Sequence, residues 1–326
     1  MKKLFKFLII SSLFLLVLVL VSFFYIYSLF QPVSSEIVTS SRFVIPKGQA
    51  VSIIAERLEE ENFIKNDLVF RLLVKQQDLV DKIQAGSFEI SPSMTVREIA
   101  AELTKGTNDL WVTIPEGWRR EEIAESLAAQ DLLEYDQEEF LRLTDDQEGM
   151  LFPDTYLVPK MMTTESIASL FYNTFEKKVI NGLEDEFEQS NQSFNEILVM
   201  ASILEREAKG YEQMRHVAGI LSNRLEIGMA LQVDASLQYA KGYDTAQKSW
   251  WVPPTAADKA KDSLFNTYKN SGLPPYPICN PGLDAIKAVL NPLDTNDLFY
   301  IHDRNGKIHF AQTLEEHNQN VNQYLR

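Results

Sequence analysis

A run of apolar residues from Phe7 to Phe30 dominates the N-terminal end of this 326-residue chain. Serines and tyrosines interrupt the run, but no charged residue does. Because about 20 helical residues cross the hydrocarbon core of a bilayer, the run is long enough for a transmembrane helix. Three lysines precede it, and the next basic residue is Arg42. The positive-inside rule therefore predicts a cytoplasmic N-terminus at 1–6, an anchor at 7–30 and an extracytoplasmic location for the rest.

A cleaved signal peptide is the alternative interpretation of the same run. Signal peptides have a shorter apolar region and end in small residues at the cleavage site. Ser28-Leu29-Phe30-Gln31 is a poor site of this kind, so we expect a retained single-pass anchor in the cell membrane. The polar residues 31–41 lack helical periodicity, which is typical of a short tether.

The composition indicates a folded, acidic protein. Hydrophobic residues make up 45% and charged residues 24%, as in globular proteins. The net charge of −15 argues against nucleic acid as a partner, because phosphate binding needs clustered Lys and Arg. A single cysteine, Cys279, excludes an intramolecular disulfide and a cysteine-rich zinc site. The common nucleotide-binding and hydrolase motifs are absent from the sequence, so we expect neither cofactor nor metal.

One pattern occurs twice after the tether. Val44-Ile45-Pro46-Lys47-Gly48 precedes an amphipathic stretch at 54–58, and Thr113-Ile114-Pro115-Glu116-Gly117 precedes a similar stretch at 123–127. Each copy predicts a strand, a turn and a helix. A strand at 85–90 and a capping box from Thr95 to Glu98 complete a small α+β domain at 42–106. The fold class is therefore α+β, with a larger mixed α+β domain at 107–326.

One helix could carry chemistry. Ser193 and Glu196 form a capping box, and Ile197–Leu204 contains no charge, so the helix is expected to be buried on all sides. It ends in Glu205-Arg206-Glu207. At 100° per residue, Glu205 shares the face of Leu198, whereas Glu207 points toward the other side.

A carboxyl that emerges from an apolar face is desolvated, which raises its pKa as a general acid requires. The alternative is that Glu205 pairs with an arginine such as Arg224 and only joins two helices. Periodicity alone does not exclude Glu207 as the acid. Leu231-Gln232-Val233-Asp234 alternates like a strand that brings Gln232 and Asp234 beside Glu205.

The C-terminal third contains an irregular segment and a hairpin. Four prolines and two glycines between Gly272 and Gly282 predict an ordered loop, which suits either a sugar groove or a cover over a core. Residues 298–311 predict a hairpin that turns at Asn305-Gly306. His302 and His309 lie on it without a third metal ligand.

The ordered series of motifs resembles the MltG (YceG-like) endolytic murein transglycosylases, bacterial enzymes that cut nascent peptidoglycan. The matching segments are Thr113–Trp118, Leu151–Tyr156, Ala201–Glu207, Leu231–Asp234, Asn266–Tyr268, Gly272–Pro275 and Asn280–Gly282. The resemblance implies that 42–106 is a LysM-like domain and that 107–326 is the catalytic domain. Two departures are Tyr276, where the family commonly has glycine, and a longer segment around Trp250-Trp251.

The family's catalytic glutamate is the first in its Ala-Ser-Ile-x-Glu-x-Glu stretch, which corresponds to Glu205. The implied reaction is cleavage of the bond between N-acetylmuramic acid (MurNAc) and N-acetylglucosamine (GlcNAc). Glu205 protonates the glycosidic oxygen, and the C6 hydroxyl of the same MurNAc attacks C1 to close a 1,6-anhydro ring. Asp234 is the best candidate if a second carboxylate assists.

The expected partners are peptidoglycan glycan strands and membrane-bound peptidoglycan synthases, without a cofactor. The alternatives are a muramidase hydrolase on the same scaffold and a non-catalytic, membrane-anchored glycan-binding or adaptor protein. The candidate substrate-binding residues are Gln232, Asp234, Asn266, Tyr268, Pro274 and Pro275.

Overall fold

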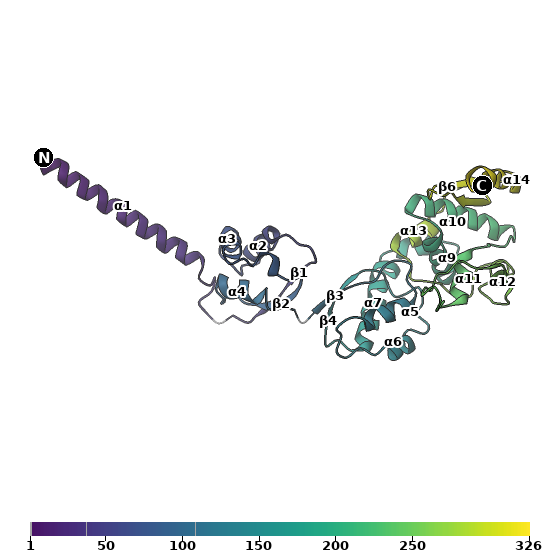
Figure 1. The fold of residues 1–326 in the computed structure, drawn as a ribbon, viewed down its shortest axis with the longest axis horizontal. Helices are drawn as coiled ribbons and strands as arrows, with labels where there is room; N and C mark the ends of the chain where they lie inside the picture. Colours follow the sequence, from purple (N-terminus) through teal and green to yellow (C-terminus); the bar gives the residue numbers. More distant parts are fainter. Residues whose placement is uncertain (1, 37, 108) are drawn as a thin grey trace. The chain divides into compact units, whose positions relative to one another are not determined.

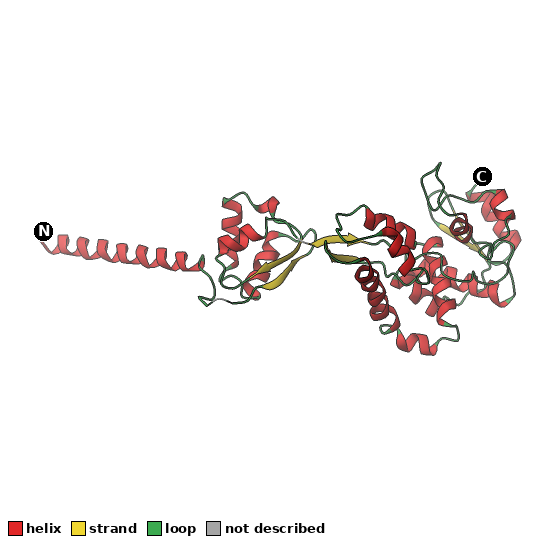
Figure 2. Ribbon diagram, turned by 90° about the horizontal axis from the view of Figure 1, so that it is seen from below, coloured by secondary structure: helices red, strands yellow, loops and turns green. Residues whose placement is uncertain are grey.

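The computed structural model describes residues 2–36, 38–107 and 109–326, without the side chains of residues 2–12 (Figure 1). The chain forms two compact units. Unit 1 comprises Met1–Trp111 and Leu157–Met161, and unit 2 comprises Val112–Tyr156 and Met162–Arg326. Over the described ranges, helices are combined with small two-stranded sheets, which confirms the predicted α+β class (Figure 2).

Unit 1 begins with helix α1 (Lys2–Leu29), which contains most of the predicted membrane span at 7–30. The side chains of residues 7–12 lie outside the described part of the structure. No helix among the described residues is both long enough and apolar enough to cross a membrane. The span therefore stays a prediction from the sequence.

A small sheet and three helices follow α1 in unit 1. Strands β1 and β2 pair antiparallel, with Phe43 opposite Phe88, and both rings are buried. The capping box of Thr95 and Glu98 is present, as predicted. The elements are β1 (Ser41–Ile45), α2 (Val51–Glu60), α3 (Asp67–Gln76), β2 (Gly86–Ile90) and α4 (Val96–Glu102), with a 3-10 turn at Val80–Lys82.

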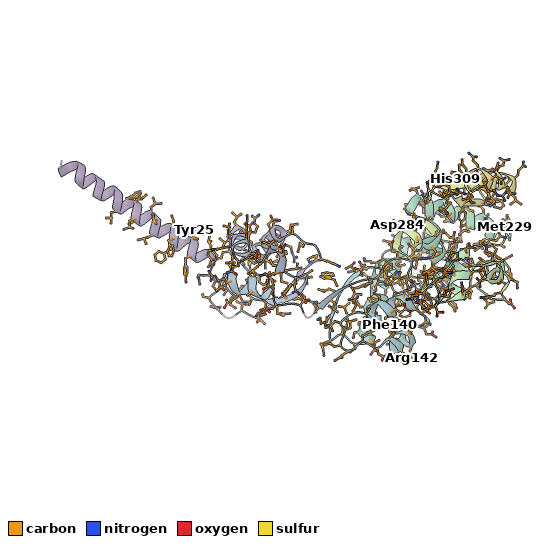
Figure 3. The ribbon with its side chains drawn as sticks, viewed as in Figure 1. Tyr25, Phe140, Arg142, Met229, Asp284 and His309 are labelled. Atoms are coloured by element: carbon orange, nitrogen blue, oxygen red, sulfur yellow. The ribbon has the colours of Figure 1, made fainter. Side chains whose placement is uncertain are left out.

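The second copy of the strand–turn–helix pattern is also confirmed, since β3 (Asp109–Thr113) precedes α5 (Arg120–Ala128). Strand β3 pairs with β4 (Thr155–Pro159). Phe140 is buried, while Arg142, two residues later, lies at the surface (Figure 3). The helices that follow α5 are α6 (Gln137–Leu143), α7 (Thr164–Phe175), a π-helical turn (Glu176–Ile180) and α8 (Glu184–Gln189).

Helix α9 (Phe194–Glu207) lies at the centre of unit 2. The predicted capping box of Ser193 and Glu196 starts it, and every residue from Ile197 to Leu204 is buried. It packs against α10 (Tyr211–Glu226) and α13 (Leu283–Leu290), with a smaller contact to α11 (Asp234–Lys241). The remaining elements are α12 (Ala256–Ala260), the hairpin strands β5 (Phe299–His302) and β6 (Ile308–Ala311), and α14 (Leu314–Tyr324).

The predicted strand at 231–234 is wrong. Gln232 adopts a φ of 53°, which breaks an extended chain, and Asp234 is the first residue of α11. The alternation that suggested a strand has another cause: Leu231 and Val233 are buried, whereas Gln232 and Asp234 are exposed. The C-terminal hairpin, in contrast, is confirmed, with Gly306 at a φ of 78° in its turn.

Candidate active site

The last turn of α9 carries two carboxyl groups on different faces. Glu205 and Glu207 are two positions apart, which corresponds to about 200° around the helix axis. The hydrogen bonds follow this geometry, because Glu205 contacts the start of α13 and Glu207 contacts the C-terminal hairpin. The burial that the sequence predicted for this helix therefore affects two acids in different surroundings.

Glu205 is held at the N-terminus of α13. Its Oε2 accepts the backbone N–H of Gly282, the residue before that helix, at 2.9 Å. Burial raises the pKa of Glu205 to about 7, and the charges of Glu116 and Asp284 add to this effect. The Gly282 N–H and the charge of Arg206 act in the opposite direction.

Arg224 does not pair with Glu205, although the sequence left that possibility open. Its Nε donates to the carbonyl of Leu298 at 2.7 Å, and its Nη1 donates to the carbonyl of Leu231 at 2.6 Å. The guanidinium group therefore links α10 to the hairpin and to the segment before α11. It also lies in the wall of a cavity.

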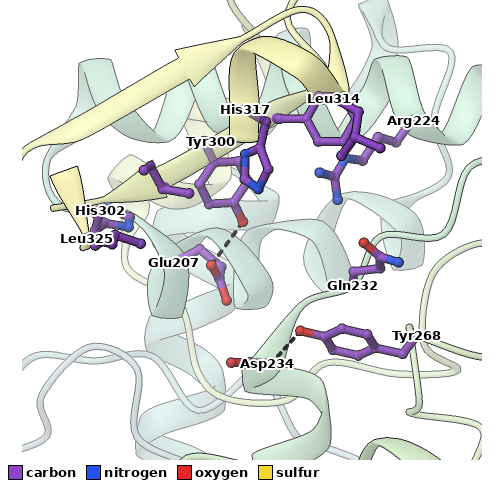
Figure 4. Close-up of a pocket in the computed structure, with 12 residues that line it drawn as sticks. Glu207, Arg224, Gln232, Asp234, Tyr268, Tyr300, His302, Leu314, His317 and Leu325 are labelled. Carbon is purple, nitrogen blue, oxygen red and sulfur yellow. Dashed lines mark hydrogen bonds between the residues drawn. The ribbon is translucent and has the colours of Figure 1, made fainter. Parts of the chain in front are cut away.

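Glu207, and not Glu205, lines that cavity, which has a volume of about 420 Å³ (Figure 4). The hydroxyl group of Tyr300 on β5 donates to Glu207 Oε2 at 2.9 Å. Burial is the main cause that raises the pKa of Glu207, and the charge of Asp234 raises it further. Hydrogen bonds from Tyr300 and from the N–H of Ala235 lower it. Glu207 is thus a desolvated acid in a polar cavity.

Asp234 lines the same cavity as part of a hydrogen-bonded group. The hydroxyl group of Tyr268 donates to Asp234 Oδ1 at 2.6 Å (Figure 4). Lys259 Nζ donates to the Tyr268 oxygen at 2.8 Å and lies 3.2 Å from Asp234 Oδ1. The side chain of Asp234 is half exposed, so it is accessible to a ligand in the cavity.

The structure brings together three of the six predicted substrate-binding residues. Gln232, Asp234 and Tyr268 line the cavity with Glu207. The cavity lining does not include Asn266, Pro274, Pro275 or the predicted catalytic Glu205.

Asn266 has a structural position instead. Its side chain is fully buried, and its amide donates to the backbone carbonyls of Lys259 and Lys261. It therefore fixes the loop that carries Tyr268. Pro274 is buried, and Pro275 is exposed.

Sequence reasoning missed Tyr300 and Lys259. Tyr300 lies on the predicted hairpin, but its contact with Glu207 joins residues 93 positions apart, and periodicity carries no signal for such a contact. Lys259 lies on the short helix α12, in a polar segment without a clear pattern. The signal that could have indicated Tyr300 is its place on a hairpin strand that packs on the core.

The two neighbouring tryptophans lie outside the cavity lining. Trp251 Nε1 donates to Glu122 at 2.8 Å, and the guanidinium group of Arg206 lies 3.9 Å from the centre of the Trp251 ring. Trp250 Nε1 donates to Glu125 at 3.3 Å. These contacts attach the longer segment to α5.

The family model described as the YceG-like family matches residues 43–323. The chain belongs to the YceG-like family. This YceG-like chain is 30% identical over 320 residues to a Streptococcus pneumoniae serotype 2 protein named endolytic murein transglycosylase. That match covers 86% of this chain and 58% of the relative, so the chain spans little more than half of the pneumococcal protein.

A Bacillus subtilis protein of the same name is 29% identical to this YceG-like chain over 335 residues, which cover 93% of the chain and 90% of the relative. The crystal structure of a putative YceG-like protein from Listeria monocytogenes matches with a TM-score of 0.59 and 29% identity. It covers 88% of this chain and 99% of the other. The resemblance predicted from the motifs is thereby confirmed.

Proposed function

We propose that this YceG-like protein is a lytic transglycosylase that cleaves the MurNAc–GlcNAc bond of peptidoglycan and leaves 1,6-anhydro-MurNAc ends. Two relatives that match most of the chain are named endolytic murein transglycosylase, which supports the substrate class. The observation that carries the chemistry is the position of Glu207, a desolvated carboxyl in a cavity that also presents hydroxyl, amide and carboxylate groups.

The geometry favours Glu207 as the general acid. Burial raises the pKa of Glu207, which is the direction that a general acid requires, and its carboxyl group faces the cavity (Figure 4). Glu205 also has a raised pKa, but its carboxyl group accepts the Gly282 N–H at the start of α13. The assignment of Glu205 from the resemblance stays a prediction, and the two glutamates can be separated by experiment.

The proposed reaction needs one proton and no water. The Glu207 carboxyl donates its proton to the glycosidic oxygen as the C1–O bond breaks, and GlcNAc leaves with a free hydroxyl. The C6 hydroxyl of MurNAc attacks C1 and closes the anhydro ring, while its proton passes to the Glu207 carboxylate. Positive charge develops at C1 in the transition state, and the Asp234 carboxylate in the same cavity stabilises that charge.

We further propose that the chain is anchored in the cell membrane by residues 7–30, with the N-terminus inside and the residues after the anchor outside. The absence of charged residues from the apolar run and the lysines before it support this orientation. Residues 42–106 would then act as a LysM-like module that binds glycan close to the membrane. Membrane-bound synthases are the proposed source of the nascent strands.

Mass spectrometry of digested glycan tests the proposed activity. Purified full-length protein in detergent is incubated with uncrosslinked glycan strands, and the ends of the products are identified. We expect anhydro ends on the MurNAc side of each cut. Reducing ends without anhydro ends would identify a muramidase hydrolase, and glycan that is bound but uncut would identify an adaptor protein.

A further inference from the structure

We propose that Lys259 is a positioning residue, which holds the Asp234 carboxylate and the Tyr268 phenol as one hydrogen-bonded group on the cavity wall beside Glu207. This inference rests on the proposed transglycosylase function. It assigns a role in the reaction to a residue of α12 that contacts two cavity residues.

Three polar groups close a small triangle. Lys259 Nζ is 2.8 Å from the Tyr268 hydroxyl oxygen and 3.2 Å from Asp234 Oδ1, and the Tyr268 hydroxyl donates to the same Asp234 oxygen at 2.6 Å. Because the Lys259 ammonium has only donors, the Tyr268 oxygen must accept from it and use its own proton toward Asp234. The ammonium group therefore fixes the direction of the hydrogen bond that orients Asp234.

The three groups come from different segments, so the triangle also fixes the wall itself. Asp234 is the first residue of α11, Lys259 lies on α12, and Tyr268 follows the buried Asn266 in the loop after α12. The Asn266 amide donates to the carbonyl of Lys259, so the loop and the helix are already joined at the backbone. The Lys259 side chain extends this rigid connection to the acid.

The groups around Asp234 show why the position of its carboxylate matters. The charge of Asp234 acts on Glu207 of α9 and raises the pKa of that acid. Arg224 on α10 acts on Glu207 and on Tyr268, and Tyr300 on β5 donates to Glu207. Lys259 is the cation paired directly with Asp234. Its ammonium group therefore holds in place the carboxylate whose charge acts on Glu207.

A partly exposed ion pair contributes little to folding, so a change in stability would not reveal this role. The test therefore follows the titration of Lys259 in wild type, Asp234→Asn and the control Lys261→Met. It also follows turnover in Lys259→Met, Lys259→Arg and Lys261→Met, each as the full chain in detergent. Lys261 lies two residues away and pairs with Asp258 instead. Thermal unfolding confirms that each variant is folded.

The first readout needs no turnover. The ¹³Cε resonance of Lys259, assigned by its loss in Lys259→Arg, is followed against pH. Burial lowers the pKa of Lys259, but the hydrogen bonds to Tyr268 and Asp234 raise it. The midpoint of the Lys259 titration should therefore move to lower pH in Asp234→Asn and stay near wild type in Lys261→Met. An unchanged midpoint in Asp234→Asn would overturn the inference, whatever the activity.

The second readout is the kcat and the KM for anhydro-ended product. If Lys259 positions the cavity wall for the reaction, Lys259→Met should lower kcat more than it raises KM, and Lys259→Arg should restore most of the kcat. Lys261→Met should stay near wild type. An unchanged kcat in Lys259→Met would overturn the role in the reaction. If the Lys259 titration moves as expected but wild-type protein forms no anhydro ends, the proposed function fails while the contact of Lys259 with Asp234 is upheld.

Discussion

Glu205 and Glu207 illustrate how neighbours give similar side chains different roles. Both acids have raised pKa values because α9 is buried. Glu205 uses its carboxylate to accept the N–H of Gly282, the residue before α13, a contact that favours the charged form. Glu207 faces an open cavity and accepts a hydrogen bond from the phenol hydroxyl of Tyr300. The surroundings of Glu207 therefore leave room for a substrate oxygen.

Tyr300 should shift the pKa of Glu207 without being essential for activity. Its hydrogen bond lowers the pKa of Glu207, so Tyr300→Phe should raise that pKa further. Since the basic limb of the kcat/KM profile reports loss of the acid's proton, this limb should move to higher pH in the variant. A pH profile of anhydro-ended product formation measures the shift. A basic limb that stays in place would show that Glu207 is not the acid titrated in that limb.

Glu148 is a buried acid outside the proposed reaction. Its Oε1 accepts the N–H of Arg120 at 3.2 Å and the amide of Asn280 at 3.0 Å. Burial raises the pKa of Glu148 from its ordinary value of 4.5 to about 8, with a further contribution from the charge of Glu121.

This shift predicts a pH-dependent stability. Between about pH 4.5 and pH 8 the folded protein holds the Glu148 proton more tightly than the unfolded chain does, so its contribution to stability falls as the pH rises. Glu148→Gln removes the ionisation. The free energy of unfolding of wild type, relative to this variant, should therefore decrease from pH 5 to pH 8. Urea denaturation at both pH values measures this difference in the free energy of unfolding. A difference between wild type and Glu148→Gln that is the same at pH 5 and pH 8 would contradict the argument.

At the scale of elements, α10 approaches the chain after α13 very closely. A Cβ added at Gly219 would lie 2.2 Å from the carbonyl oxygen of Leu293. Asn223 on the same helix donates to the carbonyl of Thr295 at 2.7 Å, which holds the two segments at this distance. A glycine inside a helix is thus explained by packing.

Gly219→Ala should reverse the usual effect of helix propensity. Alanine normally stabilises a helix interior by about 1 kcal/mol relative to glycine. Here the clash with backbone should outweigh that gain and lower the free energy of unfolding by about 1–3 kcal/mol. Glu226→Ala, at an exposed position of α10, serves as the control in the same denaturation experiment. A stabilised Gly219→Ala variant would contradict the packing argument.

Local signals explain which elements could be predicted. The capping boxes at Ser193 and Thr95 and the turn at Gly306 depend on residues a few positions apart, and all three were correct. The strand predicted at 231–234 failed because burial alternates there in a loop. Its Gln232 N–H bonds to the carbonyl of Thr267, which is distant in sequence.

The candidate site was predicted only in part, because some of its contacts join residues that are distant in sequence. The helical-face argument separated Glu205 from Glu207, but it could not indicate which face meets a cavity. That depends on Tyr300 and on the loop that carries Tyr268, and neither is near α9 in sequence. Tertiary contacts thus decide which acid lines the cavity.

At the scale of the whole molecule, the N-terminal lysines predict the side of the membrane on which the residues after the anchor lie. A reporter that is active only outside the cytoplasm, fused after Arg326, should give a signal. The matched fusion of a cytoplasmic reporter should be silent. A cytoplasmic signal would contradict the proposed action on cell-wall glycan.

The central claim is that Glu207 is the general acid of an anhydro-forming reaction. It is tested most directly by the yield of anhydro-ended glycan from wild type, Glu207→Gln and Glu205→Gln, each verified as folded. Since general acid–base catalysis contributes about 10²–10⁴-fold, Glu207→Gln should lose at least that much activity. Glu205→Gln should keep most of its activity. A dead Glu205→Gln beside a Glu207→Gln that turns over near the wild-type rate would contradict the account.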